Sequence, residues 1–199
     1  MSTYNQSHYY YFLLLKLLSA LVVIFGLGII IFFIVVQPHS FKFYVTEAEL
    51  TQFDYTNNTL HYNLVLNFTV RNPNEKLSIY YDKVEALAFY EGSRFASPDV
   101  ITDMNSFGQC KKSTDTISAV FAGQQMLLLD NDQVSDFNKD KSVGIYNIYV
   151  KLYFRIRFRV GDFITRTMKP KVKCDLKVPF INSNTTLTLF ETTNCDVHF

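Results

Sequence analysis

Residues 148–160 read IYVKLYFRIRFRV, and this stretch decides the fold. Apolar side chains occupy every second position, and tyrosine, lysine and arginine occupy the positions between them. Successive side chains of a β-strand point to opposite faces, so this pattern predicts a strand with one buried face and one wet face. Residues 60–70, LHYNLVLNFTV, alternate in the same way. We therefore predict two half-buried strands that contribute to one core.

Shorter alternating segments predict further strands along the chain. They lie near 43–53, 84–90, 115–122 and 187–199, and a Gly161-Asp162 turn predicts a returning strand from Phe163 onward. Residues 132–141 are the best candidate for a helix within this part of the sequence. Asn72-Pro73-Asn74 predicts a turn after the strand at 60–70. Many strands with little helix are typical of a two-sheet antiparallel β-sandwich, which is the fold class we predict.

An uncharged apolar segment precedes the strands. Residues 17–36 read LLSALVVIFGLGIIIFFIVV, and a helix of this length spans roughly 30 Å, the thickness of a bilayer's hydrocarbon core. A buried core helix would show a polar stripe, and a cleaved signal peptide normally has a shorter apolar region with a small-x-small cleavage site. Neither feature is found here. We predict a retained transmembrane helix at 17–36, a tail at 1–16 and a folded domain at 37–199.

The direction of this span rests on candidate glycosylation sites. Lys16 and Lys42 flank the span equally, so the distribution of positive charge does not orient it. Three Asn-x-Ser/Thr sequences follow the span, and one precedes it at Asn5. The three acceptors after the span are Asn57, Asn67 and Asn184. We expect the tail to be cytosolic and the domain to lie outside the cytosol.

Two of the three cysteines fit a hairpin register. A turn at residues 182–185, in a hairpin centred between Asn184 and Thr185, would place Cys174 opposite Cys195 and leave Cys110 over as a free thiol. The same register opposes Val172 to Val197, Phe180 to Leu189, and Lys173 to Asp196. Apolar pairs then share one face and an ion pair the other, as a correct register requires. We predict a Cys174–Cys195 disulfide, with two free buried thiols as the alternative.

The sequence carries no recognisable catalytic or metal-binding motif. Its four histidines do not form an His-Glu-x-x-His pair, and no Cys-x-x-Cys, Gly-x-Ser-x-Gly or phosphate-binding glycine loop is found. We therefore predict no enzymatic activity, no catalytic residues, no bound metal and no cofactor.

Positive charge is concentrated in one region. Residues 151–177 hold nine basic and two acidic side chains, a net charge of +7, while the remainder of the chain carries −6. Arg155, Arg157 and Arg159 share the outward face of one strand at about 7 Å spacing. With Lys171 and Lys173 they predict a face for anions: an acidic polysaccharide, phosphorylated headgroups or an acidic protein, but not nucleic acid. The alternative is that these charges only keep an outer strand soluble and unpaired.

An ordered set of segments also resembles a known family. After the span at 17–36 come Asn67-Phe-Thr-Val-Arg-Asn-Pro-Asn74, Ile79-Tyr-Tyr-Asp82, Arg157-Phe-Arg-Val-Gly161, Lys169-Pro-Lys-Val-Lys-Cys-Asp-Leu-Lys-Val-Pro179 and Asn194-Cys-Asp-Val-His-Phe199. This set resembles the plant harpin-induced-like family, also called the non-race-specific-disease-resistance-like proteins, which carry the group-two late-embryogenesis-abundant domain. The resemblance covers nearly the whole chain from the span onward.

The resemblance implies a fold and a class of function. It implies a sandwich like immunoglobulin or fibronectin type III domains, in a single-pass plasma-membrane protein, in some members at plasmodesmata, linked to pathogen and water-stress responses. It brings no catalytic residues. The Asn-Gly-Asp adhesion motif of one member is not matched, because this chain has Val160-Gly161-Asp162.

Two functions follow as expectations. The first is a non-enzymatic anchored protein that presents its sandwich to the cell wall or to partner membrane proteins. The alternative is a lipid-handling protein close to the bilayer, which would need an apolar cavity inside the sandwich. A filled core would favour the first.

Overall fold

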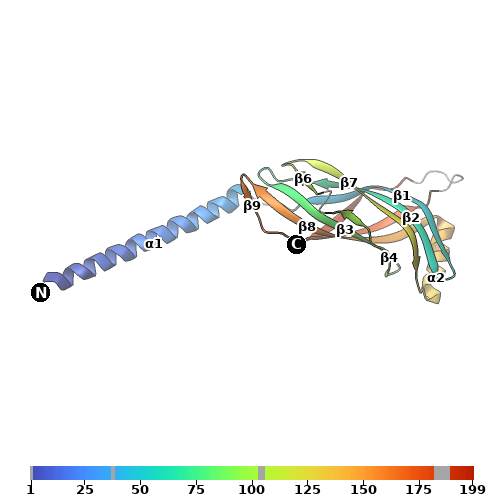
Figure 1. Cartoon of the computed structure of the whole chain (residues 1–199), viewed down its shortest axis with the longest axis horizontal. Helices are drawn as coiled ribbons and strands as arrows, with labels where there is room; N and C mark the ends of the chain where they lie inside the picture. The colour runs from blue at the N-terminus through green and yellow to red at the C-terminus, as the bar shows by residue number, and fades with distance from the viewer. Residues whose placement is uncertain (1, 37–38, 103–105, 182–188) are drawn as a thin grey trace. The chain divides into compact units, whose positions relative to one another are not determined.

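The computed structural model describes residues 2–36, 39–102, 106–181 and 189–199. Within them the chain forms two compact units, Met1–Pro38 and His39–Phe199. The first unit is a helix, and the second is a β domain that carries one short helix (Figure 1).

Helix α1 (Ser2–Val36) contains the predicted span. Its segment Tyr10–Ile31 is long and apolar enough to cross a membrane. The helix begins well before residue 17, because the preceding tyrosines, Phe12 and three leucines include no helix breaker. The apolar segment therefore includes Lys16. Bulky side chains such as Ile24 are exposed along the helix, and a helix that is apolar all round is typical of a membrane span.

The second unit is built from antiparallel strands. They are β1 (Lys42–Thr56), β2 (Thr59–Arg71), β3 (Ser78–Tyr90), β4 (Ser93–Ala96), β5 (Asp99–Ile101), β6 (Phe107–Gln109), β7 (Thr114–Met126), β8 (Ile145–Val160), β9 (Phe163–Ile164), β10 (Lys171–Pro179) and β11 (Thr193–His198). The order is β4-β3-β8-β10-β11-β1-β2-β7, with β5 and β6 also on β3 and β9 on β8. Because β11 pairs with both β10 and β1, it joins the two layers of the sandwich. The predicted mainly β, antiparallel fold class is confirmed.

The predicted elements agree with the structure wherever the alternation is long. The ranges 43–53, 60–70, 84–90, 115–122 and 148–160 all lie inside strands. The predicted helix lies inside α2 (Asn131–Val143), which begins with a capping box between Asp130 and Gln133 and ends at Gly144 in the left-handed conformation. The short strands β4, β5 and β6 were missed, because three or four residues show no readable period.

The hairpin register is confirmed near the cysteines and wrong beyond them. Val172 lies opposite Val197, Lys173 opposite Asp196, and Cys174 is bonded to Cys195 with an S–S distance of 2.03 Å. Cys110 is free and exposed.

Phe180 does not pair with Leu189. The ladder between β10 and β11 ends at Lys173 and Asp196, because residues 193–195 of β11 pair with β1 instead. Phe180 instead bridges Leu50 in parallel, and Leu189 is 85% exposed. The predicted strand at 187–199 is correspondingly shorter, Thr193–His198 within the described part. The predicted turn at 182–185 lies outside the described residues.

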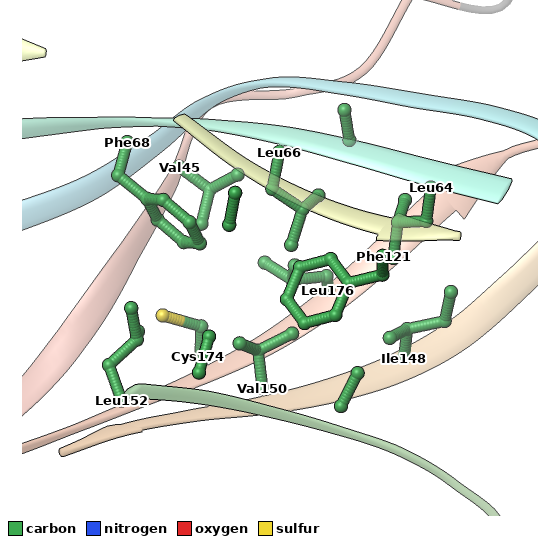
Figure 2. Close-up of a cluster of buried hydrophobic side chains, with 14 of the residues drawn as sticks. Val45, Leu64, Leu66, Phe68, Phe121, Ile148, Val150, Leu152, Cys174 and Leu176 are labelled. Atoms are coloured by element: carbon green, nitrogen blue, oxygen red, sulfur yellow. The ribbon is translucent and has the colours of Figure 1, made fainter. Parts of the chain in front are cut away.

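The inner faces of the two layers fill the space between them. Phe68 and Phe121 from one layer meet Val150 and Leu176 from the other (Figure 2). All four side chains are at least 98% buried. Apolar burial of this kind supplies the main stabilisation of such a domain, at about 25 cal/mol per Å².

Aromatic rings attach α2 to the end of the sandwich. Phe53 of β1 contacts Tyr146, Tyr90, Phe95 and Phe137 with ring centroids 4.7, 5.3, 5.6 and 5.9 Å away. Phe137 is the buried residue of α2. The cluster closes the core at the end where β1 and β2 are connected. An ion pair between Asp54 and Lys141 of α2 supports the same attachment.

The tyrosines of this cluster predict loss of stability at alkaline pH. Burial, and then the charges of Asp54 and Asp140, raise the pKa of Tyr146 to about 12. Burial and the Asp140 carboxylate also raise the pKa of Tyr90. An unfolded tyrosine ionises near pH 10, so the stabilisation is fully present below that pH and is lost between about pH 10 and 12. Denaturant unfolding across this range should show a shallower decline for Tyr146→Phe, and an equally steep decline would contradict the assignment.

Candidate anion-binding face

The five basic residues predicted to bind anions lie on adjacent strands of one layer. Arg155, Arg157 and Arg159 are on β8. Lys171 and Lys173 are on β10, opposite Tyr153 and Lys151 of β8. The lysines therefore stand beside the middle of β8 and not beside the arginines. The five predicted residues therefore form two basic groups, the arginines on β8 and the lysines on β10, rather than one continuous face.

Arg157 is held by a carboxylate from the neighbouring strand. Its Nε and Nη2 donate to the two oxygens of Asp82 at 2.9 and 2.7 Å. Asp82 sits at a register shift of β3, where the extra residue turns its side chain toward β8. This bidentate hydrogen bonding and charge raise the pKa of the Arg157 guanidinium. Because the pair neutralises itself, Arg157 adds little free charge to the face.

Arg159 supports the turn that follows it. Its Nε donates to the carbonyl of Gly161 at 2.7 Å, and its Nη1 donates to the Tyr80 hydroxyl at 3.1 Å. Its Nη2 also lies 3.7 Å from Asp162. Arg155 lies opposite Lys83. The arginine row is thus partly committed to the fold. The lysine group is the better candidate for anion binding, and within it Lys173 lies opposite Asp196 while Lys171 lies opposite His198.

The lysines alternate with aromatic rings on the outward side. Lys151 Nζ lies 4.9 Å from the ring centre of Phe89 and 5.1 Å from that of Tyr149, and Lys171 Nζ lies 5.7 Å from that of Tyr153. We call this set the lysine–aromatic face: Phe89, Tyr149, Lys151, Tyr153, Lys171 and Lys173. Rings offer flat apolar contact, and ammonium groups offer charge-assisted hydrogen bonds to carboxylates. The alternation along β8 predicted that its tyrosines and Lys151 face outward. Phe89 belongs to the lysine–aromatic face only because the β3–β8 register places it opposite Tyr149.

Asn72 and Asn74 form a buried clamp at the start of the domain. Sequence alone predicts a turn at these residues and does not show that both asparagines are at least 99% buried. Asn72 Nδ2 donates to the carbonyls of Leu77 and Cys110 at 2.8 and 3.0 Å. Asn74 Oδ1 accepts from the N–H of His39 at 2.6 Å, and its Nδ2 donates to the His39 carbonyl at 2.7 Å. The clamp fastens the first described residue of the domain.

The predicted glycan acceptors differ in accessibility. Asn57 is exposed in the β1–β2 turn with φ of 50°. Asn67 is half-buried on β2, and its Nδ2 donates to Glu47 at 2.7 Å. Asn184 lies outside the described residues. Asn57 is therefore the best acceptor of the two that the structure describes.

Across the described ranges, no three His, Cys, Asp or Glu side chains gather closely enough to hold a metal ion. The described residues offer one surface suited to anion binding, the lysine–aromatic face, and one buried clamp that supports the fold.

Comparison with known proteins identifies the class to which this disulfide-linked β domain belongs. Residues 67–175 match the family model described as late embryogenesis abundant protein, and the chain belongs to that family. A solution structure from Arabidopsis thaliana is 13% identical, covering 71% of this chain and 84% of that chain with a TM-score of 0.36.

The similar proteins of known name show to which group within this family the chain belongs. NDR1/HIN1-like protein 3 of Arabidopsis thaliana is 41% identical over 179 residues, covering 89% of this chain and 76% of the relative. NDR1/HIN1-like protein 10 of the same plant is 42% identical over 184 residues, covering 89% and 79%. The chain is a member of the NDR1/HIN1-like group, and the resemblance read from its sequence motifs is confirmed.

Proposed function

We propose that this protein is a non-enzymatic, single-pass plasma-membrane protein of plant defence or stress responses. Its tail at 1–16 faces the cytosol, the helix crosses the bilayer, and the domain at 37–199 faces the cell wall. The observation that carries the proposal is an apolar helix followed by a domain with a Cys174–Cys195 disulfide, since disulfides persist on the oxidising side of a membrane. Membership of the NDR1/HIN1-like group supports the defence or stress role.

The filled sandwich supports this function over lipid handling. Side chains such as Phe121 and Leu176 occupy the space between the layers in Figure 2, where a lipid carrier would need a cavity. A lipid-binding pocket of several hundred Å³ would require their displacement.

Glycosylation at Asn57 tests the direction of the span. When the full chain is expressed in plant cells, enzymatic removal of N-glycans should increase its gel mobility, and Asn57→Gln should lose one step of that shift. The physical reason is that Asn57 is exposed in a turn, so the folded domain accommodates the glycan without rearrangement. A chain whose mobility does not respond to glycan removal would argue for the opposite direction or an unused site. Cleavage of the domain by protease added outside intact cells then separates these two cases.

We propose that the domain binds acidic wall polysaccharide through the lysine–aromatic face. A polyuronate offers carboxylates to Lys171 and Lys173 and sugar C–H faces to Tyr149 and Tyr153. Lys171→Gln/Lys173→Gln should weaken retention of the detergent-solubilised chain on an immobilised polygalacturonate column.

The matched control for this experiment is Lys76→Gln/Lys139→Gln. It removes the same charge from two exposed positions outside β8 and β10, and it should keep most of the retention. Equal loss in both variants would indicate net charge rather than a face, and unchanged retention of the Lys171/Lys173 variant would refute the proposal. Because Arg157 is committed to Asp82, Arg157→Gln should affect stability more than retention.

A further inference from the structure

Apolar side chains are exposed at the tip formed by β8 and β9. Phe163 is 69% exposed, Ile164 45% and Met168 41%. The tip is nevertheless ordered by its backbone. Ile164 lies opposite Arg159, and Ile156 and Met168 exchange N–H to carbonyl hydrogen bonds of 2.9 and 2.8 Å. Three large apolar groups are therefore held outward at defined positions.

His39, the first described residue of the domain, lies toward the same end. Phe41, two residues after the clamped His39, packs on Phe154 and Phe199 with ring centres 5.6 and 5.9 Å apart. The N–H of Phe154 donates to the Pro170 carbonyl at 3.0 Å, in the segment that returns from the tip. Within the domain, β9 lies at the end opposite α2 in Figure 1. Only residues 37 and 38 separate Val36 from His39, which limits the connection to about 11 Å even for a fully extended chain.

Positive side chains border the apolar tip. Arg166 and Lys169 are both exposed in the segment between β9 and β10. Apolar groups bordered by arginine and lysine are typical of surfaces that enter the headgroup layer, where rings sit at the boundary and cations meet phosphates. Because Ile164 and Met168 are aliphatic and have no ring on which a sugar could stack, a lipid interface suits the tip better than a polysaccharide.

We propose that the β8–β9 tip enters the headgroup layer of the same membrane that α1 crosses. Phe163 and Ile164 bury their side chains at the interface, and Arg166 and Lys169 contact lipid phosphates. The domain then has a second, non-covalent attachment to the bilayer that fixes which face it turns to the wall. This inference rests on the proposed membrane anchoring.

The test uses the fact that the sequence contains no tryptophan. Phe163→Trp introduces a single fluorescent probe at an exposed ring position. The full chain is reconstituted in nanodiscs of phosphatidylcholine and phosphatidylglycerol, with and without brominated phosphatidylcholine. We expect the tip tryptophan to emit at shorter wavelength than tryptophan in water and to lose most of its emission to the brominated lipid. The matched control is Leu128→Trp, at a 77% exposed position between β7 and α2, which should emit as in water and keep its emission.

Each outcome decides the proposal. Equal emission loss in both variants, or none in the Phe163→Trp variant, overturns the tip contact. A shorter emission wavelength in the Phe163→Trp variant without quenching by lipid indicates that a protein covers the tip, and also overturns it. Adding Arg166→Gln/Lys169→Gln to the Phe163→Trp chain should weaken the quenching, and unchanged quenching overturns the role of the two cations.

Carbonate extraction of membrane vesicles that hold the same variants distinguishes failure of the tip contact from failure of the anchor. A chain that stays in the membrane while its tip tryptophan is unquenched overturns only the tip contact. A chain that is extracted overturns the proposed anchor as well.

Discussion

Replacing Asn72 with alanine is expected to lower the free energy of unfolding of the domain by about 4 kcal/mol, because several buried groups lose their partners at about 1–3 kcal/mol each. The side chain donates to the carbonyls of Leu77 and Cys110. Its Oδ1 accepts from the backbone N–H and the Nδ2 of Asn74, both at 3.0 Å. Loss of Asn72 therefore also loosens Asn74, which holds His39.

Urea unfolding of the full chain in detergent micelles, followed by circular dichroism, measures this effect. Asn138→Ala on the exposed face of α2 is the control and should change stability by less than about 0.5 kcal/mol. Hydrogen exchange should accelerate at His39 in the Asn72 variant before the strands unfold. If the two variants unfold alike, the clamp contributes little and the buried network is compensated by water.

The second large effect is expected at the disulfide. Cys174→Ala/Cys195→Ala should lower the free energy of unfolding by about 3 kcal/mol, because the bridge closes a loop of about twenty residues in the unfolded chain. The bridge joins β10 to β11, and β11 pairs over only three residues with each of its neighbours. Because β11 connects the two layers, loss of the bridge weakens the attachment of β11 and opens the sandwich along one side.

Cys110→Ala provides a matched control with the same chemistry at an exposed, free cysteine. It should leave stability within about 0.5 kcal/mol of the unmodified chain. A reducing agent should destabilise the unmodified chain and the Cys110 variant but not the double variant. Unfolding curves of the unmodified chain that coincide with and without reductant would contradict the structural role of the bridge.

Sequence reasoning succeeded where a pattern repeats locally. The alternation in 60–70 and 148–160 predicted β2 and β8, because side chains of a strand with one buried face must follow a period of two. The cysteine register succeeded because Val172, Lys173 and Cys174 each found a matching partner on the opposing strand. It failed a few residues later, at Phe180, because β11 leaves β10 and pairs with β1, while Phe180 bridges Leu50 of β1.

The candidate site was harder to predict. Arg155, Arg157 and Arg159 share a strand as expected, but the partner of Arg157 is 75 residues away. No local pattern shows that β3 carries a register shift at Asp82 or that its Phe89 reaches Lys151. The lysine–aromatic face is therefore a product of strand pairing.

The sequence by itself determined which residues form the long strands, which segment is apolar enough to cross a membrane, and to which family the chain belongs. These properties depend on neighbours within a few positions or on motifs that stand in order. Only the tertiary structure decided that Asn72 and Asn74 are buried clamps, that Arg157 is neutralised, and that Phe163 lies at the end that holds His39. Each of these properties depends on contacts between segments far apart in the chain. Such contacts determine which side chains are buried and which charges are paired.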